Sequence, residues 1–347
     1  MKKNRQYLLL SCIFLAAAVT AGGCAAAEGE KDLVYVGHNQ AFDHPTNTAL
    51  LAFEEYIESR LGDRYDVEVY PSELLGSQTD MVQLTQTGAI DICVASNSIL
   101  ETFSENYTLF NMPYLFASSE AYHRAMDDKT VTAPIFNSTA EAGFRAVAWI
   151  DAGTRNFYTV STPVLSPADL RGLKIRVQQS PTNVQMMRLL GGSATPMGFG
   201  EVYTALQSRV IDGAENNEMA LTSNGHGDIC KFYSYDMHQM IPDILVANNR
   251  FLENMSPEDR QIFEEGFRLV NEIQRREWVK AVEQAKEKAQ ATQQVRFFYP
   301  DTRPFQEICM PMHQEFLAGH EDIRPVYDRI QEYNIQYPSS ALTEDSK

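Results

Sequence analysis

The chain has 347 residues and a formal net charge of −17, and 44% of its residues are hydrophobic, which is enough for two domains with sizeable cores. Such an acidic composition excludes nucleic acid and anionic membrane surfaces as partners, because both require basic patches. A small anionic ligand is still compatible with it, since remote carboxylates are screened beyond ~8–10 Å at physiological ionic strength.

The first 23 residues have the pattern of a signal peptide. Three cations precede an apolar run that is too short to be a stable membrane span, so the chain is expected to be exported. Small residues then lead to Cys24 and resemble a bacterial lipobox, which predicts cleavage before Cys24 and its lipidation; ordinary cleavage in the same stretch is the alternative. Removal of Lys2, Lys3 and Arg5 takes the net charge from −17 to −20. We expect an extracytoplasmic protein that meets the membrane only through this lipid.

The next segment alternates between predicted strands and helices. A strand is expected at 32–39, a helix at 46–62, a strand at 65–71, and a helix, glycine turn and strand within 81–97. This β-α-β-α-β order predicts a largely parallel sheet covered by helices, and ligands of such sheets bind at the carboxyl ends of the strands. The polar residues at those ends are His38, Asn39, Ser96 and Asn97.

A second α/β block begins near residue 144. Within it, 173–177 alternates apolar residues with Lys174 and Arg176, which predicts a strand. Taken alone, the alternation places Arg176 in solvent. That interpretation fails only if other polar groups converge on the same place. A further helix is expected in 201–213, followed by "AENN", and a strand in 240–249.

The segment after Ser256 predicts a long helix. Ser256 is a suitable N-cap, Pro257 suits the first helical position, and an apolar stripe continues for ~35 residues. At ~1.5 Å per residue such a helix is roughly 50 Å long, which exceeds one domain of this size. We therefore expect it to run across both domains.

The motifs of several enzyme classes are missing from the chain. We find no GxSxG, HExxH, P-loop, GxGxxG or CxxCH. His38, Asp43 and His44 are close in sequence but match no compact metal site, so no metal and no cofactor are expected. Asp212 and Glu215 are expected at a turn and on a solvated face rather than as an acid–base pair.

Three cysteines remain in the exported chain. Cys93, Cys230 and Cys309 cannot all pair, and none has the spacing of a redox or zinc motif. We expect buried small side chains, with one disulfide as the alternative.

Polar residues gather instead at predicted strand ends. Two arginines and an asparagine suit a carboxylate, because a guanidinium can donate to both oxygens in parallel and an amide can add a further donor. The residues in question are Asn39, Ser96, Asn97, Arg155, Arg176 and Asn216.

Five segments together resemble a known family. They are "YPSELLGSQTDMVQLTQTGAIDI", "FNMPYLF", "DAGTRNF", "LRGLKIRVQQSP" and "PMGFGEVYTALQSRVIDGAENN", and they are similar to the solute-binding proteins of TRAP (tripartite ATP-independent periplasmic) transporters. The resemblance implies an α/β, two-lobe periplasmic-binding-protein fold (type II-like) with a hinge and a long helix spanning both lobes. Lobe I would comprise 32–153 plus 242–281, and lobe II 154–241 plus 282–347.

The resemblance also implies roles for individual residues. The arginine of the "KIRV" strand pairs with the ligand carboxylate in this family, which here implies Arg176. Arg155 would be a second cationic contact and Asn216 a donor to the same carboxylate. Further ligand contacts are implied for Phe199, on the ligand's apolar side or in the core, and for Asn39 and Gln78 from the first lobe.

Two departures bear on the ligand. Gln78 and Ser96 stand where sialic-acid-binding relatives often carry acids, which argues against sialic acid. "ENNEMA" and "YDMHQMIPDILVANN" are most similar to the branch that binds hexuronates, so Asn217 and His238 are expected on sugar hydroxyls. A C4-dicarboxylate would need a second cation opposite Arg176, and the candidates for it are His38 and His44.

The sequence thus predicts a non-catalytic receptor for a sugar-acid monocarboxylate such as glucuronate or galacturonate. It would deliver the ligand to the membrane subunits of a TRAP transporter. A C4-dicarboxylate or other organic acid is the alternative ligand within the same family. More remote alternatives are an exported uronate-acting enzyme that uses His238 and an arginine, and a sensor module for a membrane kinase.

Overall fold

Runs rich in β-branched and aromatic residues form two β-sheets in the computed structural model, which describes residues 31–339. The signal peptide and Cys24 lie outside the described residues. The strands are β1 (Asp32–Gly37), β2 (Tyr65–Tyr70), β3 (Ile92–Ser96), β4 (Phe144–Ile150), β5 (Arg155–Thr159), β6 (Lys174–Val177), β7 (Ser193–Pro196), β8 (Gly213–Asn216), β9 (Phe232–Gln239), β10 (Asp243–Asn248) and β11 (Arg296–Phe298).

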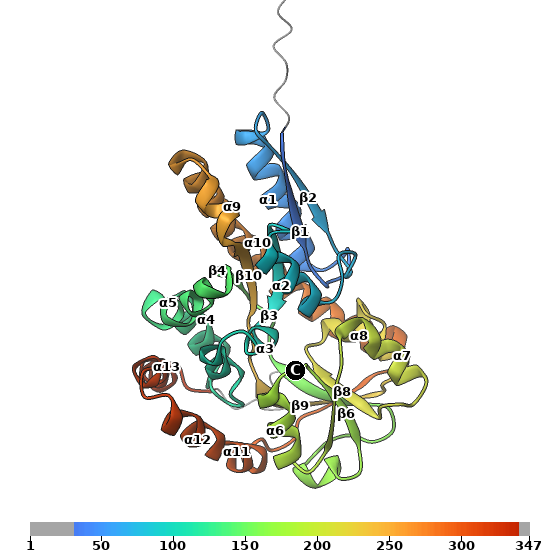
Figure 1. Ribbon diagram of the computed structural model, residues 1–347. Helices are drawn as coiled ribbons and strands as arrows, with labels where there is room; N and C mark the ends of the chain where they lie inside the picture. Colours follow the sequence, from blue (N-terminus) through green and yellow to red (C-terminus); the bar gives the residue numbers. More distant parts are fainter. Residues whose placement is uncertain (1–30, 340–347) are drawn as a thin grey trace, which may run out of the picture.

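Helices cover both sheets and extend away from them (Figure 1). The helices are α1 (Pro45–Leu61), α2 (Gln78–Thr87), α3 (Asn97–Leu100), α4 (Ser119–Asp127), α5 (Lys129–Phe136), α6 (Pro181–Leu189), α7 (Val202–Gln207), α8 (Met219–Thr222), α9 (Asn249–Asn254), α10 (Pro257–Gln293), α11 (Arg303–Cys309), α12 (Pro311–Gly319) and α13 (Arg324–Gln336). A 3₁₀ turn, Phe199–Glu201, precedes α7.

The first sheet has the strand order β2-β1-β3-β10-β4 and forms the first lobe. Its first three strands are parallel, as predicted, whereas β10 is antiparallel to both β3 and β4. On one face, α1 packs against α10 through Phe53, whose ring lies 5.9 Å from Phe263 and 5.5 Å from Phe267. The close approach depends on Gly266, where a Cβ would lie 2.8 Å from the Phe53 ring.

The second sheet has the order β11-β9-β5-β8-β6-β7 and forms the second lobe. The chain passes between the sheets from β4 to β5, from β9 to β10, and along α10. The predicted long helix is confirmed, since α10 packs on α1 and β4 of the first lobe and on α8 of the second.

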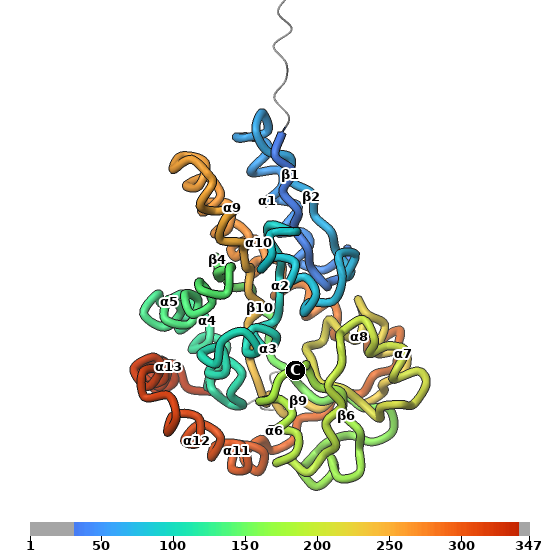
Figure 2. Tube along the Cα trace, in the orientation of Figure 1, coloured from blue at the N-terminus to red at the C-terminus, as the bar shows by residue number. Residues whose placement is uncertain are grey.

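The last of the C-terminal helices returns to the first lobe. In the chain trace, α11, α12 and α13 follow one another below α4 and α5 (Figure 2). α13 packs on α4 and α5, and Asn334 bonds with the backbone of Leu115 and Ala117. The predicted lobe boundaries place all of 282–347 in the second lobe. Within that segment α11 packs on α6 and β9 of the second lobe, whereas α13 packs on the first-lobe helices.

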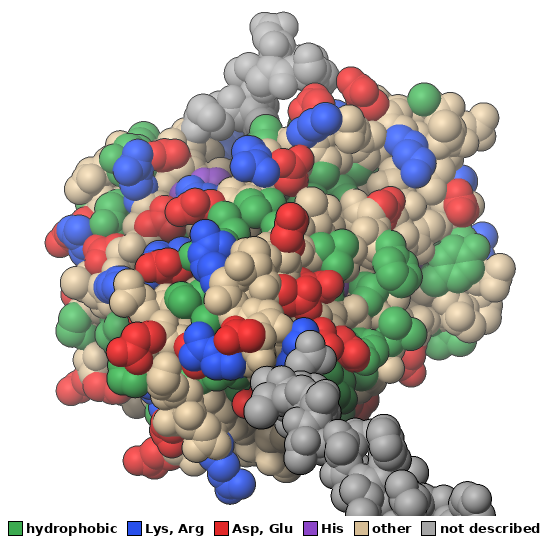
Figure 3. Space-filling model, turned by 90° about the horizontal axis from the view of Figure 1, so that it is seen from above, with side chains coloured by type: hydrophobic (Ala, Val, Ile, Leu, Met, Phe, Trp, Pro, Cys, Tyr) green, Lys and Arg blue, Asp and Glu red, His purple; other side chains and the backbone are tan. Residues whose placement is uncertain are grey.

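Charges of both signs are interspersed on the surface. On the face seen in Figure 3, Asp and Glu side chains alternate with Lys and Arg rather than surrounding one broad basic area. Within residues 31–339 no helix is long and apolar enough to cross a membrane. Cys93, Cys230 and Cys309 are buried free thiols, so the disulfide alternative is wrong for this structure.

Candidate ligand-binding cleft

A pocket lies between the two lobes, at the ends of strands from both sheets. The empty space between its lining atoms is about 530 Å³ when the open solvent at its mouth is included. Most of its lining is polar. The lining residues are Asn39, Gln40, Ser77, Gln78, Ile99, Ala152, Arg155, Arg176, Gln178, Gln179, Met197, Gly198, Phe199, Asn216, Asn217 and Asp243.

Arg176 lies in this pocket and is only 4% exposed. The interpretation that places it in solvent is therefore wrong, because β6 is an interior strand between β8 and β7. Its Nε and Nη2 donate to the Met197 carbonyl oxygen at 3.2 and 2.9 Å, and its guanidinium lies 5.7 Å from the centroid of the Phe199 ring. Among the described residues nothing accepts a hydrogen bond from Nη1. Burial lowers the pKa of Arg176, and Glu215 offsets part of that effect.

Arg155 is the second buried cation, and a carboxylate fixes it. Its Nε donates to Glu215 Oε2 at 2.5 Å, and its Nη1 to Asn216 Oδ1 at 3.2 Å. The contact exists because β5 and β8 are antiparallel neighbours, with Phe157 paired to Glu215. The solvated position expected for Glu215 is wrong, since its side chain is fully buried.

Glu215 is ionised although it is buried. Burial raises its pKa, but Arg155 and His238 together more than reverse this and lower it to about 2. Burial likewise lowers the pKa of Arg155, and the attraction of Glu215 outweighs it, so that this pKa is raised. The pair is fully charged at neutral pH, and Arg155 has one counter-ion before any ligand arrives.

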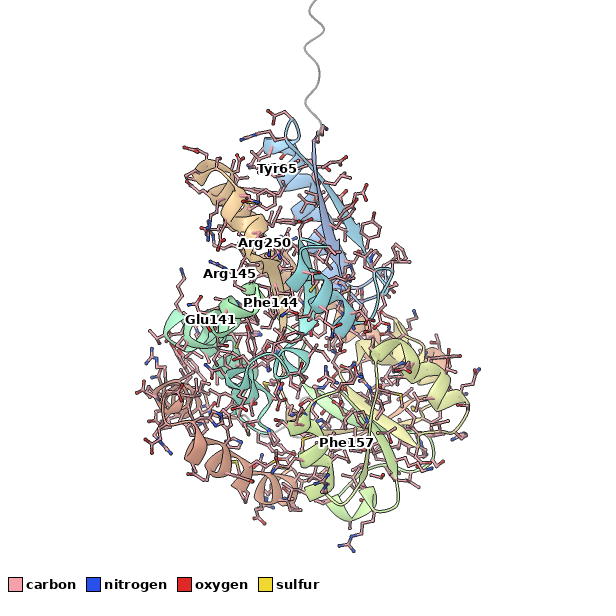
Figure 4. All side chains as sticks on the ribbon, in the orientation of Figure 1. Tyr65, Glu141, Phe144, Arg145, Phe157 and Arg250 are labelled. Carbon is pink, nitrogen blue, oxygen red and sulfur yellow. The ribbon has the colours of Figure 1, made fainter. Side chains whose placement is uncertain are left out.

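His238 extends this arrangement away from the pocket. Its Nδ1 lies 2.8 Å from Asp236 Oδ2 and its Nε2 3.5 Å from Glu215 Oε2, and its ring stacks on Phe157 at 4.5 Å. Phe157 lies within the second lobe (Figure 4). Burial lowers the pKa of His238, but Asp236 and Glu215 outweigh it and raise the pKa to about 9. The structure does not bring His238 to the pocket, because the two carboxylates hold it behind Arg155.

The first lobe contributes amides and one acid to the pocket. Asn39 follows β1, and its Oδ1 is buried without a hydrogen-bond partner among the described residues. Gln78 begins α2, and its Oε1 accepts from the Ser96 backbone at 3.0 Å. Asp243 begins β10 and is 6% exposed. Asn217, from the second lobe, also lines the pocket, and its Nδ2 donates to the Ala152 carbonyl at 2.9 Å.

Ser96 and Asn97 do not line the pocket, although both were expected to. Ser96 Oγ accepts from Gln178 Nε2 at 2.8 Å, which joins the two lobes. Asn97 Nδ2 donates to the Tyr107 carbonyl and to Asn111 Oδ1, both at 2.8 Å. Each side chain is therefore used in structural hydrogen bonds beneath the pocket.

Further hydrogen bonds cross from lobe to lobe around the pocket. Ser98 Oγ donates to Gln178 Oε1 at 2.9 Å, Ser180 Oγ donates to the Glu101 carboxylate at 2.5 Å, and the Gly200 backbone donates to Glu73. The structure is thus a closed arrangement in which both lobes contact each other beside the pocket.

The two histidines proposed as a second cation are neutral. Burial lowers the pKa of His38 to about 4, against a weaker opposite effect of its bond to Asn47, and burial lowers that of His44 to about 3. His38 Nδ1 accepts from the Gln40 backbone, and His44 Nδ1 from the Thr46 backbone. Both rings serve the turn that leads into α1, and neither lines the pocket.

Sequence reasoning missed several lining residues. Gln178 and Gln179 directly follow β6, the strand that carries Arg176. A pair of polar residues at the end of a strand is a signal for a binding site as well as for the end of the strand. Gln40 directly follows Asn39, a predicted site residue. Asp243 had no signal of its own, because it belongs to the antiparallel strand β10, whose beginning meets the ends of the parallel strands.

The fold and the pocket can be compared with known proteins. Residues 36–320 match the family described as bacterial extracellular solute-binding protein, family 7. The chain belongs to this family. It is 40% identical over 299 residues to the uncharacterized protein YiiZ of Salmonella typhimurium, across 86% of this chain and 90% of that one.

Solved structures of solute-binding proteins have the same fold. One from Anaerococcus prevotii is 64% identical and has a TM-score of 0.88. The match covers 89% of this chain and 100% of that one, and the structure contains α/β-D-glucuronate. Another, from Bradyrhizobium, is 30% identical and has a TM-score of 0.83. The match covers 87% of this chain and 100% of that one, and the structure contains α/β-D-galacturonate. Both are TRAP periplasmic solute-binding proteins. The predicted family and two-lobe fold are confirmed.

Proposed function

We propose that this solute-binding protein captures a hexuronate, D-glucuronate or D-galacturonate, outside the cytoplasm. In this proposal the ligand carboxylate binds Arg176, with Arg155 and the Asn216 amide beside it. The single observation that carries the proposal is the buried guanidinium of Arg176, which lines the pocket and has a donor, Nη1, with no acceptor among the described residues.

Charge accounting supports one carboxylate per ligand. Arg155 is neutralised by Glu215, which leaves Arg176 as the pocket cation without an ion-pair partner among the described residues. A carboxylate accepting charge-assisted hydrogen bonds from it would satisfy Nη1 and offset the cost of burying the guanidinium. Glucuronate and galacturonate, which are bound in two solved relatives, each carry one such carboxylate.

The remaining lining suits hydroxyl groups. Side-chain amides both donate and accept, so Asn39 and Gln78 match a polyol better than an alkyl chain. The amides of Gln178 and Asn217 also line the pocket but already bond to Ser96, Ser98 and Ala152. The face of Phe199 would pack on the sugar's C–H groups. A dicarboxylate is less well served, because His38 and His44 are neutral and lie outside the pocket.

Capture in this proposal is binding without chemical conversion. The histidine invoked for a uronate-acting enzyme, His238, is enclosed by Asp236, Glu215 and Phe157 and has no route to the ligand. The closed protein would then dock on the membrane subunits of a TRAP transporter, attached to the membrane by a lipid at Cys24. Ligand favours the closed state only through contacts made across both lobes.

A thermal-shift panel on the mature protein tests the ligand class. It should compare glucuronate and galacturonate with glucose, galactose, succinate, malate and sialic acid. A ligand at ~1,000 times its Kd stabilises the folded state by about 4 kcal/mol. We expect a large shift with at least one hexuronate and none with its neutral hexose. Shifts with succinate or malate alone would replace the hexuronate with a dicarboxylate, and no shift with any acid would overturn the proposal.

A further inference from the structure

The pocket has a cation at one side and an acid at the other. The second lobe supplies Arg176, and the first lobe supplies Asp243, a carboxylate that forms no ion pair with any described cation. Both side chains line the same pocket and are more than nine-tenths buried. A buried charge without a partner is costly unless a ligand or another group compensates for it.

The position of Asp243 is fixed by the backbone rather than by the ligand. It is the first residue of β10, and it pairs with Ser96 of β3 on one side and Ile150 of β4 on the other. Its carboxylate accepts a hydrogen bond from the Gln40 side chain, and Arg155 attracts it from beyond ion-pair distance. One acid is thus held at the first-lobe side of the pocket with lone pairs left over.

We infer that Asp243 is a specificity-determining residue which accepts hydrogen bonds from ligand hydroxyls remote from the carboxylate. This inference rests on the proposed function and adds the group that selects the sugar. A carboxylate accepts charge-assisted hydrogen bonds from hydroxyls, which are stronger than those accepted by an amide. It also repels a second carboxylate at that end, so the site takes a hydroxylated monocarboxylate.

The unsatisfied amide of Asn39 points to the same chemistry. Asn39 lines the pocket from the first lobe, and its Oδ1 is a buried acceptor with no partner among the described residues. The first lobe therefore presents Asn39 Oδ1, which lacks a donor, and the Asp243 carboxylate, to which Gln40 donates, and hydroxyls are the donors that a sugar acid carries. Burial raises the pKa of Asp243 to about 6, against the opposing attraction of Arg155, so most of it is an acceptor at neutral pH.

Calorimetry with monodeoxy sugars tests this assignment. The proteins are wild type, Asp243→Asn and the control Asp91→Asn, which removes one negative charge at a first-lobe residue outside the pocket; Asp91 Oδ2 accepts from the Tyr35 backbone at 2.9 Å. Asp243→Asn should weaken D-glucuronate at least 10-fold at pH 7.5, and Asp91→Asn less than 2-fold. For at least one monodeoxy glucuronate, wild type and Asp243→Asn should bind with equal affinity.

The outcomes separate this inference from the proposed function. If wild type binds no hexuronate, the proposed function fails and the inference with it. If wild type binds glucuronate but Asp243→Asn binds it equally well, the inference alone is overturned. It is also overturned if Asp243→Asn weakens glucuronate and every monodeoxy analogue by the same factor, since that pattern means a general structural role.

Discussion

The two sides of the pocket differ in charge: the second lobe supplies buried cations, and the first lobe supplies mainly uncharged amides. On the second-lobe side, Arg155 and Arg176 lie on neighbouring parts of one sheet, and Arg155 is fixed by a chain of buried charges through Glu215 and His238 to Asp236. On the first-lobe side, Asn39 follows β1 and Gln78 begins α2; both are uncharged, Asn39 Oδ1 is unpaired among the described residues, and the one charge is the acid Asp243.

The difference separates attraction from discrimination. A preorganised cation binds any small carboxylate. Arg176 is held in place by the Met197 carbonyl, and Glu215 is already paired with Arg155. Neutral amides contribute less per contact, but each depends on a hydroxyl at one position. We therefore expect changes on the second-lobe side to abolish binding, and changes on the first-lobe side to alter which sugar acid is preferred.

The largest effect is expected from Arg176→Ala. Loss of one partner of a buried charge pair costs about 2–5 kcal/mol, or a weakening of roughly 30-fold to several thousand-fold. Titration calorimetry with glucuronate measures it. Arg188→Ala, an exposed cation on α6, is the control and should bind as wild type does. Near-normal affinity of Arg176→Ala for glucuronate would show that the ligand carboxylate does not bind at Arg176.

The charge chain predicts a distinct dependence of stability on pH. His238 has a folded pKa of about 9 and an ordinary value near 6.5 when unfolded. Its stabilisation is therefore fully present below about pH 6.5 and is lost as the pH rises through about 9, by an amount of order 1–3 kcal/mol.

Denaturant unfolding between pH 7 and 9.5 checks this. The loss of stability should be smaller in His238→Gln than in wild type. His226→Gln is the matched control, because burial lowers the pKa of His226 to about 3 and its titration falls outside that range. Equal slopes in wild type and His238→Gln would mean that His238 is neutral and does not hold Glu215.

A smaller effect is expected from Asn39→Ala. Its buried Oδ1 has no partner among the described residues, so removal should leave the melting temperature of the free protein unchanged or slightly higher. Loss of one ligand hydrogen bond should weaken glucuronate by about 1 kcal/mol, roughly 5-fold.

Asn47→Ala gives the opposite pattern and serves as its comparison. Asn47 Nδ2 donates to the Phe42 carbonyl at 2.9 Å, and Asn47 Oδ1 lies 3.1 Å from His38 Nε2. This variant should be less stable than wild type, and its folded fraction should bind glucuronate with wild-type affinity. If Asn39→Ala instead lowers stability and leaves affinity unchanged, Asn39 is part of the framework and not of the site.

Much of this arrangement could be predicted from the sequence. Local patterns predict β1, α1, β2, α2, β3 and α10, because alternation, caps and glycine stops are properties of neighbouring residues. The cluster of Arg155, Arg176 and Asn216 also follows from strand ends and from the family resemblance. Their meeting in one pocket agrees with that prediction.

The rest depends on contacts between distant segments. Glu215 looks like a turn residue in sequence, yet the pairing of β5 with β8 buries it against Arg155. Ser96 and Asn97 end a strand as predicted, but their side chains are taken up by Gln178 and Asn111. Asp243 gave no signal, because only the sheet order brings the start of β10 beside the ends of β3 and β4.

The central claim is that Arg176 binds the carboxylate of a sugar acid in the cleft. Titration calorimetry with D-glucuronate and with D-glucuronamide tests it most directly, since the amide keeps the ring, the hydroxyls and nearly the shape but has no charge. We predict that the amide binds at least 100-fold more weakly to wild type and that Arg176→Ala reduces this ratio to within about 5-fold. Equal affinity of wild type for the acid and the amide would contradict the account.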